Sequence, residues 1–156
     1  MATTGFQLII SWRNAESGDP IAFKQDGQRF KTSTRTLKFF SNALYKIHLK
    51  TQPATEFHHL HLGGSDLELV VMNGPNSGEY TAEWNTTGID PTKKGDRQDI
   101  TMILTGPGGN LRKVVQSKFY NKESSHAEWG HKMDSLIWTC AVDSQGNITV
   151  TDEKVQ

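Results

Sequence analysis

Residues 23–30 read Phe-Lys-Gln-Asp-Gly-Gln-Arg-Phe, and this stretch decides how the chain is organised. Asp-Gly between two short runs with apolar ends is a strong hairpin signal. A two-residue type I′ turn needs positive φ at both central positions, which Asp tolerates and Gly accepts freely. The pattern therefore predicts a two-residue turn at Asp26-Gly27 between antiparallel strands, with Phe23 and Phe30 lying diagonally across them. Phe30 is expected in the core.

Alternation of apolar and polar residues with a period of two recurs along the rest of the chain, and no long 3.6-residue pattern competes with it. Residues 6–12 are the cleanest example. About ten short strands joined by turn signals predict an all-β fold, either a single antiparallel β-barrel or a closed β-sandwich, because an open sheet of that size would curl or split. Residues 1–156 are expected to form one domain with a frayed polar tail at 152–156.

The charges balance overall, with 17 basic and 17 acidic side chains, so no global field attracts nucleic acid. Their distribution is uneven, because residues 24–50 contain seven Lys or Arg against a single acid, Asp26. Such a stretch is either a solvated sheet face or a patch that meets acidic protein or an anionic membrane surface.

The chain has no apolar run near the roughly 20 residues of a membrane helix and opens without a charged-then-apolar signal segment. Its single cysteine, Cys140, excludes an internal disulfide. These features predict a cytoplasmic protein, with peripheral association at the inner face of the plasma membrane as a further expectation.

Catalytic and metal-binding patterns are weak. His59 and His61 would share one face of a strand beside His58 and could ligate zinc or copper, but no Cys or acid stands at a matching spacing. Solvent-facing histidines are favoured, and metal binding is the weakest alternative. No G-x-S-x-G motif is present, and Cys140 lies in an alternating apolar run typical of a core. We expect no enzymatic activity and no cofactor.

The aromatic residues fit two interpretations. They fill a core, or they line a narrow lumen that holds one small apolar ligand. The candidate lumen residues are Trp12, Phe39, Leu69, Trp84, Met102 and Trp138.

Residues 23–30 also resemble the cannabinoid receptor-interacting protein family. The likeness continues in the same order through residues 21–142. It is carried by residues 36–38, 45–46, 62–64, 80–81, 87–88, 91–93, 95, 97–98, 118–121, 129–130 and Cys140. Ordered coverage of this length is more specific than any one motif. Weaker likeness before and after this range indicates a divergent, invertebrate or early-branching member.

The resemblance implies a non-enzymatic cytoplasmic protein that binds the C-terminal tail of the type 1 cannabinoid receptor and modulates its G-protein signalling. It also implies a β-barrel similar to the immunoglobulin-like fold of the Rho GDP-dissociation inhibitor. An apolar interior of that kind could shield the lipid group of an acylated G-protein subunit, which is the alternative function.

The predicted partner-binding residues are basic, because Arg and Lys form charge-assisted hydrogen bonds with acidic or phosphorylated groups. They are Arg29, Lys31, Arg35, Lys93, Lys94 and Arg97. In the alternative reading Pro91, Gly95 and Arg97 only brace a long loop.

Overall fold

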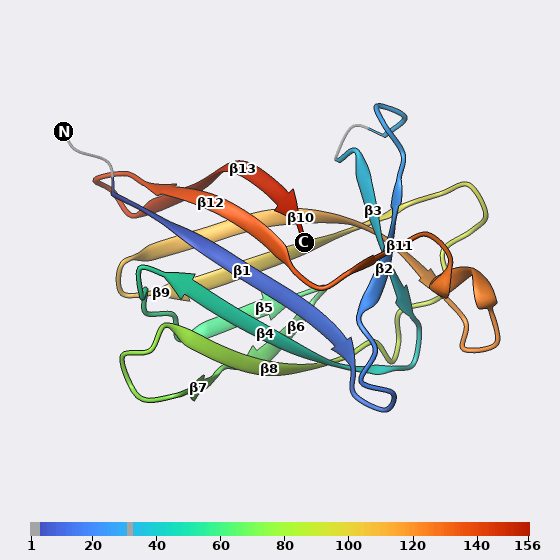
Figure 1. Ribbon diagram of the computed structural model, residues 1–156, viewed down its shortest axis with the longest axis horizontal. Helices are drawn as coiled ribbons and strands as arrows, with labels where there is room; N and C mark the ends of the chain where they lie inside the picture. Colours follow the sequence, from blue (N-terminus) through green and yellow to red (C-terminus); the bar gives the residue numbers. More distant parts are fainter. Residues whose placement is uncertain (1–3, 31–32) are drawn as a thin grey trace.

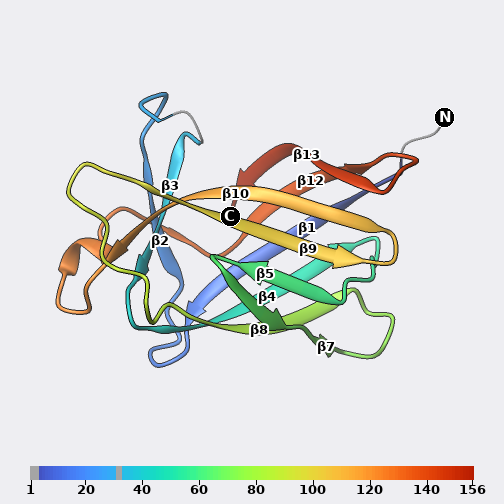
Figure 2. The same cartoon turned by 180° about the vertical axis from the view of Figure 1, so that it is seen from behind.

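The computed structural model describes residues 4–30 and 33–156 as an all-β fold, a nearly closed barrel-shaped sheet (Figures 1 and 2). One short 3₁₀ helix, η1, interrupts the strands. The elements are β1 (Thr4–Asn14), β2 (Ile21–Gln25), β3 (Arg35–Phe40), β4 (Leu44–Gln52), β5 (His59–Leu62), β6 (Ser65–Glu68), β7 (Val70–Met72), β8 (Glu79–Asn85), β9 (Gln98–Gly106), β10 (Gly109–Tyr120), η1 (Ser125–Glu128), β11 (His131–Met133), β12 (Leu136–Val142) and β13 (Asn147–Val155).

The main path of the sheet runs β11-β2-β3-β10-β13-β12-β1-β4-β8-β7, and β9, β5 and β6 branch from β10. The stretch 65–72 closes the barrel, because its β6 half pairs with β5 while its β7 half pairs with β8. The pairings are antiparallel except for two short parallel ones between β10 and its neighbours β3 and β13. The prediction of an all-β antiparallel barrel is confirmed. No helix in the described part of the chain has the length and apolar character needed to cross a membrane.

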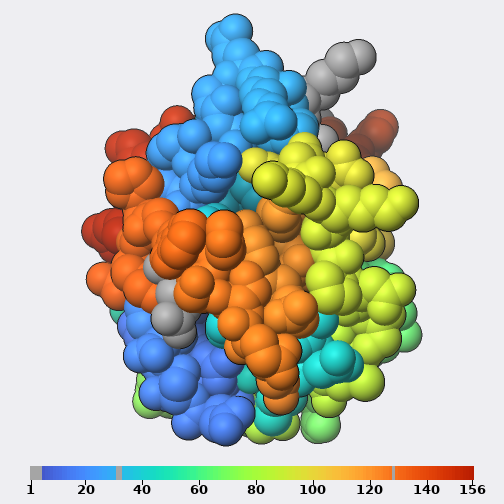
Figure 3. Space-filling model, turned by 90° about the vertical axis from the view of Figure 1, so that its right-hand side faces the viewer, coloured from blue at the N-terminus to red at the C-terminus, as the bar shows by residue number. Residues whose placement is uncertain are grey.

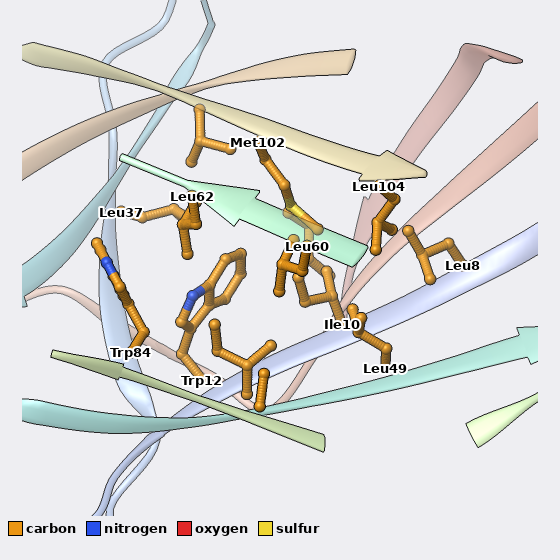
Figure 4. Close-up of a cluster of buried hydrophobic side chains, with 14 of the residues drawn as sticks. Leu8, Ile10, Trp12, Leu37, Leu49, Leu60, Leu62, Trp84, Met102 and Leu104 are labelled. Atoms are coloured by element: carbon orange, nitrogen blue, oxygen red, sulfur yellow. The ribbon is translucent and has the colours of Figure 1, made fainter. Parts of the chain in front are cut away.

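Period-two burial explains why these segments form strands. In β1, Phe6, Leu8, Ile10 and Trp12 are at most 6% exposed, while Gln7 and Arg13 face solvent. The interior they enter is apolar and closely packed (Figure 4). Phe39 is its aromatic centre, with four rings within 6 Å of its own. These belong to Trp12 (5.7 Å), Tyr45 (5.4 Å), Trp84 (5.0 Å) and Phe119 (5.6 Å).

The hairpin predicted at residues 23–30 exists, but its turn differs from the prediction. Phe23 pairs with Leu37 and not with Phe30, and the connection between β2 and β3 spans residues 26–34. Gly27 has a positive φ of 61°, whereas Asp26 does not, so the two-residue type I′ turn is wrong. Phe30 is half-buried at this connection and is not in the core.

The C-terminal residues also depart from the prediction. β13 continues to Val155 and pairs with β12 along its length, so residues 152–155 form the end of a strand and not a frayed tail. Glu153 fixes this end, because its two carboxylate oxygens bind Arg35 of β3 (2.6 Å) and the indole nitrogen of Trp138 (2.8 Å).

Candidate functional site

Three connections meet at one end of the barrel, on the right-hand side of Figure 1. They are the β2–β3 connection (26–34), the loop 86–97, and the segment 121–130 that follows β10 and contains η1. Figure 3 faces this end and shows the segment after β10, in orange, below the β2–β3 hairpin in blue and beside the loop 86–97 in yellow. Basic and aromatic side chains gather on and beside these connections, and we call this cluster the basic end. Its members are Lys24, Arg29, Phe30, Lys38, Lys93, Lys94, Arg97, Lys118 and Tyr120.

A buried ion pair lies beneath the basic end. Arg97 Nη2 lies 2.9 Å from Asp26 Oδ1, and the two side chains are only 6% and 1% exposed. Arg97 Nε also donates to Asp26 Oδ2 at 3.3 Å. Because Asp26 begins the β2–β3 connection and Arg97 ends the long loop, this pair fastens the two connections together.

A second set of polar groups completes the hydrogen bonding of this pair. The hydroxyl of Thr36 donates to Asp26 Oδ2 and accepts from Arg97 Nε (2.7 Å) and from Gln116 Nε2 (2.9 Å). Gln116 Oε1 in turn accepts from the backbone N–H of Ser33 at 3.1 Å. Buried charges are tolerated when their remaining donors and acceptors are satisfied in this way. Burial alone would raise the pKa of Asp26, but hydrogen bonds from Arg97 and Thr36 outweigh it, so the pKa lies below its ordinary value.

The ring of Phe30 contacts two guanidinium groups, one of which belongs to Arg97 of this network. The guanidinium carbon of Arg97 is 4.6 Å from the ring centre and that of Arg29 is 5.0 Å away. Cation–π contact of this kind orients an arginine without neutralising it. Arg29 is exposed, so its charge remains available to a partner.

Tyr120, at the end of β10, organises two lysines in the same way. Lys38 and Lys118 place their ammonium groups 5.6 and 5.9 Å from its ring centre. Lys118 also donates to the backbone carbonyls of Lys93 (3.2 Å) and Asp96 (3.4 Å), which ties the long loop to β10. Burial lowers the pKa of both Lys38 and Lys118, and repulsion from nearby cations, including Arg97, lowers it further. The basic end therefore carries a local positive potential.

Four exposed cations give this end its binding capacity. Lys24, Arg29, Lys93 and Lys94 face solvent, and no ion pair joins any of them to a carboxylate in the described part of the chain. Cations that are already held near one another and lack an internal counter-ion favour binding of an acidic or phosphorylated group. The chemistry that this arrangement supports is recognition of an anionic partner.

The structure separates the six predicted partner-binding residues. It brings Arg29, Lys93 and Lys94 to the exposed basic end. Arg97 lies beneath them in the ion pair with Asp26, which is the bracing role that the sequence left open. Arg35 points elsewhere, to Glu153 on β13, with 22% of its side chain exposed. Lys31 lies outside the described residues.

Sequence reasoning missed the groups that hold the basic end together. The sequence predicts only a turn-forming role for Asp26, whereas its carboxylate anchors Arg97. One signal pointed to it, because Asp26 is the only acid among seven basic residues in the range 24–50. Thr36, Gln116 and Tyr120 give no such charge signal, because they are uncharged and act through hydrogen bonds or ring contacts, some with partners more than 60 residues away.

The proposed lumen is filled in this conformation. Five of its six residues are completely buried and packed against other side chains, and Leu69 is half-buried between β6 and β7. A recess beside Trp138, lined by the apolar Leu37 and Leu136 and also by the polar Arg35 and Glu153, has a volume of about 20 Å³, which is enough for roughly one water molecule.

The histidines lie on the β5–β6 side of the barrel. His58 is paired with Glu56 at 2.5 Å and His61 with Asp66 at 2.8 Å, and both pairs are largely exposed. His59 stands opposite Glu68 in the strand register. Within residues 4–30 and 33–156 no group of three or more His, Cys, Asp or Glu side chains is arranged to hold a metal ion.

Comparison with known proteins adds a family to this geometry. The family described as CB1 cannabinoid receptor-interacting protein 1 matches residues 2–155. The match extends beyond residues 21–142, to which the sequence resemblance was confined.

Curated relatives agree with this match. The chain is 35% identical over 141 residues to CB1 cannabinoid receptor-interacting protein 1 of Mus musculus and 33% identical over 141 residues to that of Homo sapiens. The protein of Bos taurus is also 33% identical. Each comparison covers 86% of this chain and 85% of the relative.

Proposed function

Because the chain belongs to the CB1 cannabinoid receptor-interacting protein family, we propose that it binds the C-terminal tail of a cannabinoid-type receptor and thereby modulates G-protein signalling without catalysing a reaction. The observation that carries the proposal is the cluster of exposed cations at the basic end, none of which forms an ion pair with a carboxylate among the residues that the structure describes. A receptor tail that carries acidic or phosphorylated side chains would supply the counter-ions for these cations.

The rigid support beneath the cations makes this end suited to recognition. The Asp26–Arg97 pair and the Lys118 contacts hold the β2–β3 connection and the loop 86–97 in a fixed relation. A partner therefore meets charges that are already positioned, and less conformational entropy is lost on binding.

Charge reversal at the basic end tests this function. A labelled peptide with the sequence of the human CB1 receptor C-terminal tail would be titrated with the wild-type protein and with the variant Arg29→Glu/Lys94→Glu. We expect the variant to bind at least about tenfold more weakly, with a reduced salt dependence, because both substituted charges contribute to electrostatic complementarity.

The matched control is Lys46→Glu/Lys154→Glu, which makes the same change of charge at two exposed lysines on β4 and β13. The control should bind the peptide nearly as the wild type does. Equal affinity of wild type and Arg29→Glu/Lys94→Glu would contradict the assignment of the tail to the basic end.

The alternative, shielding the lipid group of an acylated G-protein subunit, would require the barrel to open. Its candidate residues are buried, and the recess at Trp138 is far smaller than an acyl chain. The closed interior therefore favours the receptor-tail proposal.

A further inference from the structure

Trp129 is the most exposed of the large hydrophobic residues in the described chain. Its exposed fraction is 56%, whereas Trp12, Trp84 and Trp138 are completely buried. It directly follows η1, in the segment 121–130 that Figure 3 shows in orange. A single exposed apolar side chain is common on protein surfaces, so the case for a role of Trp129 rests on how it is held and on its neighbours.

The backbone of Trp129 is fixed, which excludes simple looseness of the segment as the cause. The buried Lys38 ammonium donates to the carbonyls of Trp129 (2.7 Å) and His126 (3.0 Å). The Trp129 N–H donates to the same His126 carbonyl at 3.2 Å. Gly130 then turns with φ of 110°, and a Cβ there would lie 2.6 Å from the carbonyl oxygen of Phe23. The chain is thus held against β2 and β3 while the indole faces outward.

The indole is also oriented by a neighbouring ring. His126 stacks on Trp129 with ring centres 4.0 Å apart and an angle of 32° between the planes. The contact leaves the other face and edge of the indole open. An aromatic residue held in this way presents an apolar body and a polar N–H at the surface, which is the arrangement that places tryptophan at membrane–water interfaces.

Two exposed lysines flank Trp129 in the sequence. Lys122 and Lys132, in the adjoining turn and in β11, are exposed and form no ion pair with a described carboxylate. The segment 121–130 carries Lys122 against the two acids Glu123 and Glu128, so its own net charge is −1. Lys24, Arg29, Lys93 and Lys94 of the basic end add to it and make the face as a whole positive.

From this arrangement we infer that the basic end docks on an anionic membrane surface, with the Trp129 indole at the level of the lipid headgroups and the surrounding lysines against acidic lipids. The setting of Trp129 itself fits a membrane contact better than the centre of a protein interface. Trp129 is an isolated exposed apolar residue of its segment, and it lines neither the recess that contains Lys122 nor the one that contains Lys132. A protein hot spot is normally surrounded by further contacts that exclude water. This inference goes beyond receptor-tail binding and needs no receptor.

Vesicle binding tests the inference directly. The full-length protein would be sedimented with vesicles of phosphatidylcholine alone and with vesicles in which phosphatidylserine replaces part of the phosphatidylcholine. We expect binding only to the anionic vesicles, and a loss with added salt. Because the other three tryptophans are buried, acrylamide quenching of tryptophan fluorescence reports mainly on Trp129, and it should decrease when anionic vesicles are added.

Two variants and a control locate the contact. Trp129→Ala should weaken vesicle binding on the order of tenfold by removing the interfacial aromatic. Lys122→Gln/Lys132→Gln should lower it about tenfold or more at low salt, since each lysine near an anionic surface contributes. Lys46→Gln/Lys154→Gln removes the same charge elsewhere on the barrel and should change binding little. An unchanged thermal midpoint would show that each variant is folded.

Three results would overturn the inference. They are absence of binding to anionic vesicles, equal losses in the lysine variant and its control, and unchanged quenching of Trp129 on vesicles. If Trp129→Ala leaves vesicle binding intact but weakens binding of the receptor-tail peptide, Trp129 belongs to a protein interface instead. Failure of the peptide titration alone would count against the proposed function and leave the membrane contact standing.

Discussion

Arg97 and Arg35 were predicted to contact a partner, yet each is joined to a carboxylate of its own chain in a different setting. Arg97 pairs with Asp26 beneath the basic end, and the two side chains are 6% and 1% exposed. Arg35 pairs with Glu153 at 2.6 Å near the surface, and these side chains are 22% and 25% exposed. The first pair fastens two connections, and the second fastens strand β3 to strand β13.

The difference between the pairs shows what each carboxylate does. Asp26 has its oxygens fully used by Arg97 and Thr36, so its removal would leave a guanidinium buried without a counter-ion. Glu153 shares its oxygens between Arg35 and Trp138, and water can reach part of the site. Burial therefore decides how much stability depends on each carboxylate, although both distances are typical of strong ion pairs.

The largest effect is expected from Asp26→Ala. The substitution leaves Arg97 buried and unpaired and removes an acceptor from Thr36, so we expect a loss of about 3 kcal/mol in the free energy of unfolding. Urea denaturation followed by circular dichroism measures this loss. Receptor-tail binding should also weaken, because the loop 86–97 is no longer fastened to the β2–β3 connection.

A double variant separates the lost pair from general damage. Asp26→Ala/Arg97→Met removes both charges, and we expect it to be more stable than Asp26→Ala alone, since the unpaired guanidinium is gone. If the changes in the free energy of unfolding caused by the two substitutions were simply additive, Asp26 and Arg97 would not be coupled. That result would contradict the claim that burial makes this pair more important than the pair of Arg35 and Glu153.

These pairs also mark the limit of what the sequence predicts. The alternation of Phe6, Leu8, Ile10 and Trp12 reports which side of a strand is buried, so strands and the barrel follow from local pattern. Turn chemistry at Asp26-Gly27 is local as well, but the Asp26 side chain binds Arg97, 71 residues later. The connection between β2 and β3 is longer than the predicted two-residue turn. A count of basic residues cannot tell which of them find a carboxylate after folding.

The C-terminal strand illustrates the same limit. Residues 152–156 are polar and resemble a frayed end, yet Glu153 reaches Arg35 across 118 residues and Trp138 across 15. No period of two in that short stretch reveals these partners. Tertiary pairing, and not propensity, orders the end of β13.

A smaller effect is expected from Glu153→Ala. It breaks the partly exposed pair and leaves the indole N–H of Trp138 without its acceptor, so we expect a loss of about 1–2 kcal/mol. Differential scanning calorimetry would detect this as a lower thermal midpoint. Glu153→Gln retains an oxygen for Trp138 and should recover about half of the loss. A loss equal to that of Asp26→Ala would show that burial does not distinguish the two pairs.

The smallest expected effect concerns pH and isolates Asp26. Its pKa in the folded chain lies below the value of about 3.9 for a free aspartate, because hydrogen bonds from Arg97 and Thr36 outweigh burial. Between those two pKa values the unfolded chain binds more protons than the folded chain, so stability rises with pH. The contribution of Asp26 to the free energy of unfolding is therefore complete above the unfolded pKa and is lost as pH falls through the folded pKa.

Asp26→Asn should lack this pH-dependent contribution, whereas Glu153→Gln retains Asp26 and should keep it. Urea midpoints measured from mildly acidic pH downward test the contrast, and equal pH dependence in wild type and Asp26→Asn would mean that the buried carboxylate is not stabilised in its charged form.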